Sequence, residues 1–247
     1  TYGPYSGGQA SGLGEYAARW AGAWGNSIDV AWCATAAGYS EAAATTIATA
    51  NVIGAYQITM ASGSAVAVGD IVYFQQSDGQ HYRVTLVASN VVTIARYPTE
   101  AGVGLTQAVD GSSTPVNVDR FWRYYDQFDR APGTSAYASA EGGSNDEMHI
   151  IVLDRGGVIT GTAGTVIEKW DAVSKGSDAK TPEGNANYYP DVLYNSSAYI
   201  YWLDHPAGAT NWGQIVLLRA FSAPTVDPNT NVFVNGADGS APTEGQR

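Results

Sequence analysis

The segment Ser144–Trp170 contains the residues with the clearest capacity for chemistry. Two acids and a histidine, Asp146, Glu147 and His149, stand just before the apolar run 150–153. Carboxylates beside an imidazole can serve as acid and base catalysts or as metal ligands. On a strand, however, alternation places Glu147 and His149 on one face and Asp146 on the other. The pattern therefore favours a polar strand entrance, whose acids hold loop amides, over a reactive centre.

The remaining candidates for chemistry also have plainer interpretations. Asp204 and His205 are adjacent, so on a strand they face opposite ways, and Pro206 ends the strand. Cys33 lies in an apolar run, which favours a buried thiol over a nucleophile. The sequence contains no nucleophile elbow, no phosphate-binding glycine loop with its lysine and no HExxH pair. We therefore assign no catalytic, cofactor-binding or metal-ligating residues, and we expect neither a cofactor nor an enzyme.

Composition and charge argue against several classes of partner. The 247 residues suffice for one large domain or two ordinary ones. A net charge of −11, from 12 basic and 23 acidic side chains, disfavours binding to nucleic acid or to an anionic membrane. One cysteine excludes an intramolecular disulfide, and no window approaches the ~20 apolar residues of a membrane span. Both ends look cut, so we expect a piece of a longer polypeptide.

Hydrophobic patterning predicts a β-rich α+β fold. A helix is expected at 40–50, because Ser40 can cap it and alanines follow, and a helical turn is expected at 190–194. The Asp78-Gly79 turn between two alternating runs suggests a small barrel. Strands are expected at 27–34 (half-buried), 54–61, 70–75, 81–88, 91–96, 148–154, 198–203 and 213–224.

These elements predict a discontinuous organisation. A mixed-sheet core domain is expected from residues 1–50 and 119–222, with a β-barrel-like module inserted at 51–118. Residues 223–247 are expected to form a flexible tail or the start of a further segment.

Aromatic residues are the remaining feature, with seven Trp and 16 Tyr. They are dense in "FWRYYDQF" (121–128) and "YIYWL" (199–203). Exposed rows of this kind bind sugars or protein partners, whereas buried rows form core. The alternation at 199–203 suggests a strand packed on both faces, so we favour burial.

Several blocks of the sequence resemble one protein family. They are "YAARWAGAWGNSIDV", "GGSNDEMH", "GTVIEKWDAVSKGSDAK" and "NYYPDVLYNSSAYI". In this order they resemble the tail sheath protein of contractile-tailed phages, the myovirus type that includes cyanophages. The resemblance covers about 13–33 and 134–204. Residues 51–118 match no part of it and look like an insertion.

The resemblance implies a mechanical part of a virion. Full-length subunits would associate into hexameric rings and a helical sheath around the tail tube protein, after assembly in the host cytoplasm. Contraction would come from rearranged contacts between subunits, without a cofactor. The chain alone would be monomeric, because the terminal arms that join neighbours are missing.

Two other functions stay open. The first is a surface-exposed β-rich module that binds a glycan or a protein through aromatic residues such as Trp122 and Tyr125. The second is a hydrolase that uses Asp146, Glu147 and His149.

Overall fold

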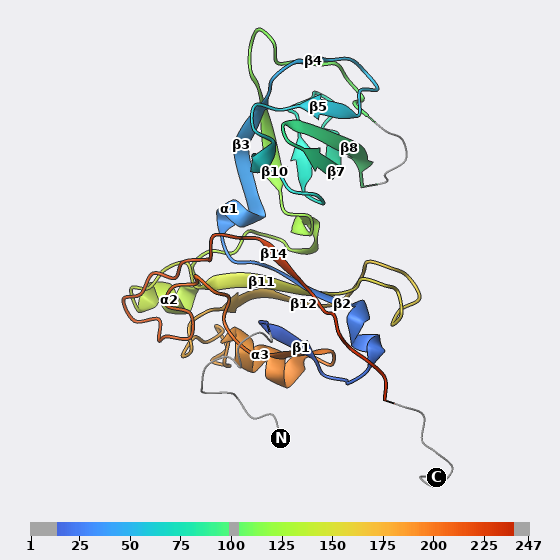
Figure 1. Ribbon diagram of the computed structural model, residues 1–247. Coiled ribbons are helices and arrows are strands. Elements are labelled where there is room, and N and C mark those ends of the chain that lie inside the picture. Colours follow the sequence, from blue (N-terminus) through green and yellow to red (C-terminus); the bar gives the residue numbers. More distant parts are fainter. Residues whose placement is uncertain (1–13, 99–103, 240–247) are drawn as a thin grey trace, which may run out of the picture. The chain divides into compact units, whose positions relative to one another are not determined.

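The computed structural model describes residues 14–98 and 104–239, which fall into two compact units (Figure 1). The chain up to Thr35 joins the chain from Pro132 onwards to form unit 1, and Ala36–Ala131 form unit 2. The inserted unit is therefore longer than the predicted 51–118 module, because residues 36–50 and 119–131 belong to it. The reason is the pairing of β3 (Ser40–Ile47) with β10 (Val116–Phe121), which ties both flanks to the insert.

Unit 1 is built on a four-stranded sheet in the order β12-β11-β2-β14. All three of its ladders are antiparallel, so the predicted mixed sheet is wrong. The central strand β2 pairs with β11 along six residues. The strands are β2 (Ile28–Cys33), β11 (Glu147–Asp154), β12 (Thr165–Ser174) and β14 (Asn229–Val232).

One face of this sheet carries the core of unit 1. Figure 1 shows helix α3 (Tyr189–Ser196) and strand β1 (Tyr16–Ala18) beside the sheet, and β1 pairs with β13 (Ile200–Trp202). Every residue of β2 and β11 is buried, so β2 is covered on both faces and not half-buried as predicted. The helices α2 (Ala136–Ala140) and η1 (Ala23–Ser27) complete the unit. The core side chains include Val30, Trp32, Met148, Ile150, Val152, Tyr189, Leu193, Ile200 and Trp212.

Unit 2 has a separate core inside a six-stranded antiparallel sheet, in the order β3-β10-β6-β7-β8-β5. Alternate residues such as Val72, Tyr82, Ile94 and Val118 point into this core. The three predicted runs at 70–96 are strands, with Gly79 at positive φ in the turn before β7. The other bounds are α1 (Ala36–Tyr39), β4 (Ala50–Asn51), β5 (Gln57–Thr59), η2 (Gly63–Ala65), β6 (Ile71–Tyr73), β7 (His81–Ala88), β8 (Val91–Tyr97), β9 (Val109–Asp110) and η3 (Tyr125–Gln127).

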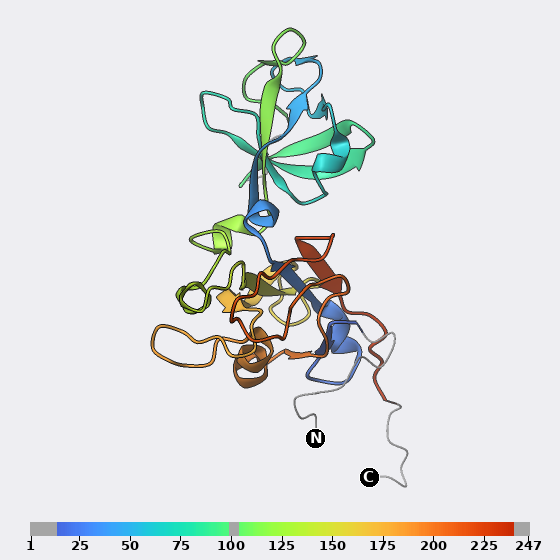
Figure 2. The same ribbon diagram turned by 90° about the vertical axis from the view of Figure 1, so that its left-hand side faces the viewer.

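The six-stranded sheet curls but is not a closed barrel in its described part (Figure 2). Its outer strands β3 and β5 meet only at the isolated bridge between Ile47 and Met60. Two backbone hydrogen bonds flank the bridge, from Ala48 N to Thr59 O at 2.9 Å and from Ala61 N to Thr46 O at 2.8 Å. The described part of the sheet therefore has the curvature of a barrel but not its closure.

Three predicted elements are wrong. Residues 40–47 form a strand instead of a helix, with Ala43 at φ 52° where β3 bulges opposite Asp119. Residues 213–224 form turns and isolated bridges instead of a strand. The predicted tail contributes β14 to the sheet of unit 1, although residues 240–247 lie outside the described residues. Within the described ranges, no helix is long and apolar enough to cross a membrane.

Candidate functional site

Asp146 and Glu147 bind the backbone and hydroxyl groups of the neighbouring loops. Asp146 Oδ1 accepts a hydrogen bond from Ser135 N at 2.8 Å, and its Oδ2 accepts one from Ser174 Oγ at 2.6 Å. Glu147 Oε2 accepts one from Gly133 N at 3.0 Å. Both side chains are buried. These two acids therefore hold the loop before α2 and the end of β12, which agrees with the interpretation as a strand entrance.

His149 faces a β-bulge rather than the two acids. Asp171 and Ala172 on β12 stand opposite this one residue, and Ala172 has a φ of 48°. Ala172 N lies 3.0 Å from His149 Nδ1, and Asp171 Oδ1 lies at the same distance. A ring nitrogen that accepts the Ala172 N–H carries no proton of its own, so it cannot also donate to Asp171. The bulge thus brings a backbone donor and a carboxylate to the same ring nitrogen of His149.

Asp154, at the end of β11, binds more partners than the acids that the sequence drew attention to. Its carboxylate accepts hydrogen bonds from Ser27 Oγ (2.5 Å), Ile159 N (2.9 Å) and Thr160 N (2.7 Å), among others. Burial alone raises the pKa of Asp154, but these hydrogen bonds outweigh it and lower the pKa to about 2. Asp154 therefore anchors the loop that joins β11 to β12.

Lys175 is a buried cation near the carboxylates of Asp227 and Asp146. Its Nζ donates to Ala34 O at 2.7 Å and lies 5.4 Å from the ring centre of Trp212. Burial lowers the pKa of Lys175 to about 8, and the carboxylates of Asp227 and Asp146 limit the shift. A lysine with such a pKa can serve as a base or nucleophile when a substrate reaches it. Here the side chain is fully buried and donates to a backbone carbonyl, which suits a structural role.

Asp204 and His205 do not form a dyad. Asp204 Oδ1 accepts from the backbone N of His205 at 2.7 Å, while the imidazole bonds to Tyr189 Oη at 2.6 Å and Tyr188 Oη at 3.2 Å. Burial lowers the pKa of His205. Trp202 and Trp212 pack edge-on against Tyr189. His205 is therefore part of an aromatic cluster at the edge of the core. The expected burial of 199–203 holds only in part, because Ile200 is buried while Tyr199, Tyr201 and Trp202 are half-buried.

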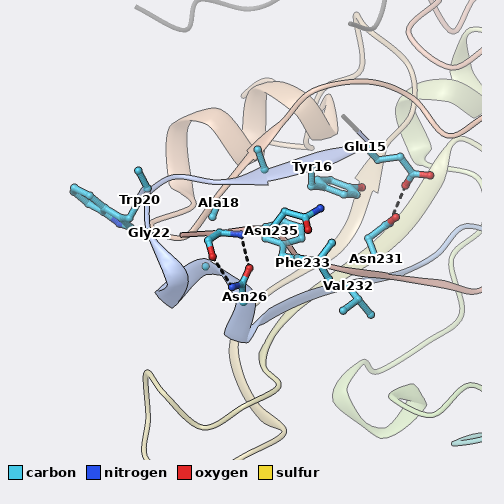
Figure 3. Close-up of a pocket in the computed structure, with 16 residues that line it drawn as sticks. Glu15, Tyr16, Ala18, Trp20, Gly22, Asn26, Asn231, Val232, Phe233 and Asn235 are labelled. Atoms are coloured by element: carbon cyan, nitrogen blue, oxygen red, sulfur yellow. Dashed lines mark hydrogen bonds between the residues drawn. The ribbon is translucent and has the colours of Figure 1, made fainter. Parts of the chain in front are cut away.

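A cavity of about 440 Å³ in unit 1 lies between the β1 segment and residues 231–236 (Figure 3). Glu15 Oε2 accepts from Trp32 Nε1 and from Asn231 Nδ2, both at 2.9 Å. Burial raises the pKa of Glu15, and these two bonds oppose the rise. Asn26 exchanges two hydrogen bonds with Gly236 at 2.9 and 2.7 Å. These polar groups fasten the chain that follows β14.

A second cavity, of about 340 Å³, lies on the outer face of the sheet in unit 2. The turn 78–80 and the pairs Tyr97-Pro98 and Tyr125-Asp126 line it, together with His81. His81 and Tyr97 are opposite each other on β7 and β8. Tyr97 Oη donates to Asp126 Oδ2. Burial, followed by this bond, raises the pKa of Tyr97.

The aromatic segment 121–128 divides between core and surface. Trp122 is only 1% exposed and stacks on Phe128, so it cannot display its ring as the binding-module hypothesis requires. Tyr125 is half-buried, lines the 340 Å³ cavity and lies near His81, with nearly parallel rings 6.5 Å apart. Of the two aromatic residues proposed to bind a ligand, Trp122 and Tyr125, only Tyr125 lines this cavity.

Cys33 is buried and its Sγ lies 3.4 Å from Thr35 O, as expected for a structural thiol. Sequence reasoning missed Lys175 and Asp154 as buried charges. Asp154 follows four apolar residues on a strand, which was a usable signal of burial. Lys175 lies in "SKGSD", a composition typical of surface turns, so nothing in the neighbouring sequence indicated that it is buried.

Within the described ranges, no cluster of three or more His, Cys, Asp or Glu side chains is arranged to hold a metal ion. Asp146, Glu147 and Asp154 accept hydrogen bonds from the protein's own backbone, and unit 2 has a cavity with polar and aromatic lining. No family model, no curated protein and no solved structure matches the chain.

Proposed function

We propose that this chain is a structural subunit of a contractile phage tail sheath. One observation supports the proposal most. The two blocks that resemble the sheath family, 13–33 and 134–204, lie far apart in sequence, yet they share one sheet through the six-residue ladder between β2 and β11. The unmatched residues 51–118 lie within the other compact unit. This is the arrangement expected when a family domain has received an insertion.

The role of the acids also supports a mechanical part. In unit 1, Asp146, Glu147 and Asp154 accept hydrogen bonds from backbone N–H groups of loops. Such bonds fix the ends of strands and stiffen the unit. A stiff unit is what a subunit needs if contraction consists of exchanging one set of contacts between copies for another.

Unit 1 carries apolar side chains that suit burial against further copies. Leu218 is 79% exposed and sits beside other exposed apolar residues of the same loop. Contiguous exposed apolar surface commonly marks an interaction site. The exposed large apolar residues of the described part of unit 1 are Trp20, Val158, Tyr194, Ile215, Leu217, Leu218, Val226, Val232 and Val234.

The test is assembly. The complete polypeptide that contains this chain, co-expressed with the tail tube protein of the same genome, is expected to form striated hollow cylinders in negative-stain electron microscopy. The 247-residue chain alone is expected to remain monomeric in light scattering. Dispersed single particles from the complete polypeptide would contradict the proposal. So would turnover in a broad substrate screen that Glu147→Ala abolishes.

A second candidate function is a surface module that binds a glycan or a protein, located in unit 2. The observation that favours it is the 340 Å³ cavity, where aromatic rings and carboxylates stand together. The two functions are compatible, because the cavity belongs to the inserted unit and the resemblance belongs to the other.

A further inference from the structure

We propose that the cavity lined by His81, Tyr97 and Tyr125 binds one pyranose ring of a neutral saccharide. The inference rests on the second candidate function and names its site and ligand class. It does not depend on the sheath proposal.

The cavity has the size and composition of a small-ligand site. Its volume of about 340 Å³ lies at the lower end of the range for such pockets, ~300–1,000 Å³. It combines aromatic side chains with a few polar ones, the mixture that orients an amphipathic ligand. A pyranose is such a ligand, with an apolar C–H face and hydroxyl groups around its edge.

Aromatic rings pack against one another beside the cavity on the outer face of the sheet. Tyr73 and His81 are opposite each other on β6 and β7, and their rings stack 5.1 Å apart at 19°. Tyr125 continues the series at 19° to His81, and Phe121 lies 5.0 Å from Tyr125. Arg83 covers the ring of Tyr97 at 4.9 Å. Supported in this way, the rings of His81 and Tyr125 need little ordering when a sugar face packs on them.

Two carboxylates, those of Asp78 and Asp126, line the cavity. Asp78 Oδ1 accepts a hydrogen bond from Gln80 N at 3.2 Å, which leaves further acceptor capacity on the carboxylate. A hydrogen bond with Thr106 lowers the pKa of Asp78, so this group stays ionised at neutral pH. Asp126 is held by Tyr97 Oη and by Gln127 Nε2 at 3.2 Å. Ionised carboxylates are strong acceptors for hydroxyl groups at a ring edge.

The same features disfavour other ligand classes. Two acids at the cavity, in a chain of net charge −11, repel anionic sugars and phosphates. A quaternary ammonium ion is bound by ring faces that converge on one point. Here the planes of Tyr73, His81 and Tyr125 are nearly parallel, so their faces do not converge on one point.

The test uses the whole 247-residue chain and six probes in NMR titrations. Chitotriose, maltotriose, cellotriose and mannotriose are the neutral probes, with sialyllactose and choline as the charged ones. At least one neutral trisaccharide is expected to show saturable shifts and saturation transfer. Tyr125→Ala is expected to raise its Kd at least about tenfold, which corresponds to the loss of about 1.4 kcal/mol. Asp126→Asn is expected to raise the Kd several-fold while leaving the rings of His81 and Tyr125 in place.

Tyr56→Ala is the matched control, because Tyr56 is an exposed tyrosine of unit 2 outside the cavity. Its Kd should stay within about twofold of the unchanged chain. Three outcomes would overturn the proposal: no neutral probe saturates, a folded Tyr125→Ala chain binds normally, or only sialyllactose or choline binds. If Tyr125→Ala loses its dispersed spectrum, the Asp126→Asn titration decides, and an unchanged Kd there counts against the site. Failure of these titrations would leave the assembly test unaffected, and the reverse also holds.

Discussion

At the scale of single residues, the charged groups of unit 1 act on the protein's own backbone. Asp154 is the clearest case, because its two oxygens serve side-chain and backbone donors of η1 and of the loop after β11. A buried carboxylate with so many donors is costly to remove, since each donor would lose its partner.

Asp154→Ala is therefore expected to lower the free energy of unfolding by about 3 kcal/mol at pH 7. Asp154→Asn should cost less, because the amide still accepts some of the bonds. The pKa of about 2 lies below the unfolded value, so this stabilisation is complete above ~pH 4 and is lost as the pH falls towards 2. Urea denaturation of both variants at several pH values measures the effect. Asp191→Ala, at an exposed position of α3, should change stability by only a few tenths of a kcal/mol.

Lys175 predicts a pH dependence of the same sign in the alkaline range. Its pKa of about 8 lies below the usual 10.5, so between these values the unfolded chain binds more protons than the folded one. Stability from this group therefore rises as the pH increases from 8 to 10.5, by about 3 kcal/mol in total. Tyrosines also titrate in this range, so the measured quantity is the difference between the unchanged chain and Lys175→Met. Parallel stability curves for the two proteins would contradict the assignment.

At the scale of elements, prediction succeeded where the signal was local. The apolar run before Asp154 and the alternating runs at 81–96 predicted their strands correctly. There, burial and turn formation both depend on a few adjacent residues. Residues 40–47 were predicted as a helix from their alanines. Their strand conformation is fixed by β10, a partner more than sixty residues away, and by the bulge at Ala43.

Contacts between distant segments also explain why the candidate site could not be predicted from the sequence. The 340 Å³ cavity joins the turn 78–80, Tyr97 on β8 and Tyr125 in η3, three segments that only the sheet of unit 2 brings together. Tyr125 was considered as a binding residue, but its neighbours were not. Lys175 was missed because its burial depends on Ala34 and Trp212, which are distant in sequence.

The contact between η2 and the turn 89–90 gives a prediction for unit 2. A Cβ added to Gly63 would lie 1.8 Å from Ser89 O, so backbone must move to admit it. Gly54 has a φ of +84° but open space around it, so Gly54→Ala should cost only about 1 kcal/mol of backbone strain. Gly63→Ala is therefore expected to destabilise unit 2 by clearly more than Gly54→Ala. Thermal melts of the two variants compare them, and equal melting temperatures would refute the close approach.

At the scale of the whole molecule, the two units have separate cores. Unit 2 is continuous in sequence, and among the described strands its sheet uses none from outside Ala36–Ala131. Residues 36–131 expressed alone are therefore expected to fold, with dispersed amide signals in NMR and one cooperative melting transition. A chain truncated after Asp227 lacks β14 and is expected to lose stability in unit 1, with unit 2 unchanged. An unfolded 36–131 fragment would show that its core is not sufficient.

The position of β2 in the middle of its sheet has a consequence for protein synthesis. This strand leaves the ribosome before unit 2, but both of its neighbours, β11 and β14, follow only after unit 2 has been translated. Because unit 2 is one contiguous stretch of chain, it can fold first. The apolar residues of β2 stay exposed until β11 and β14 have been made. The nascent chain therefore passes through a stage in which one of the two fully buried strands of its described part is the part most in need of protection by a chaperone.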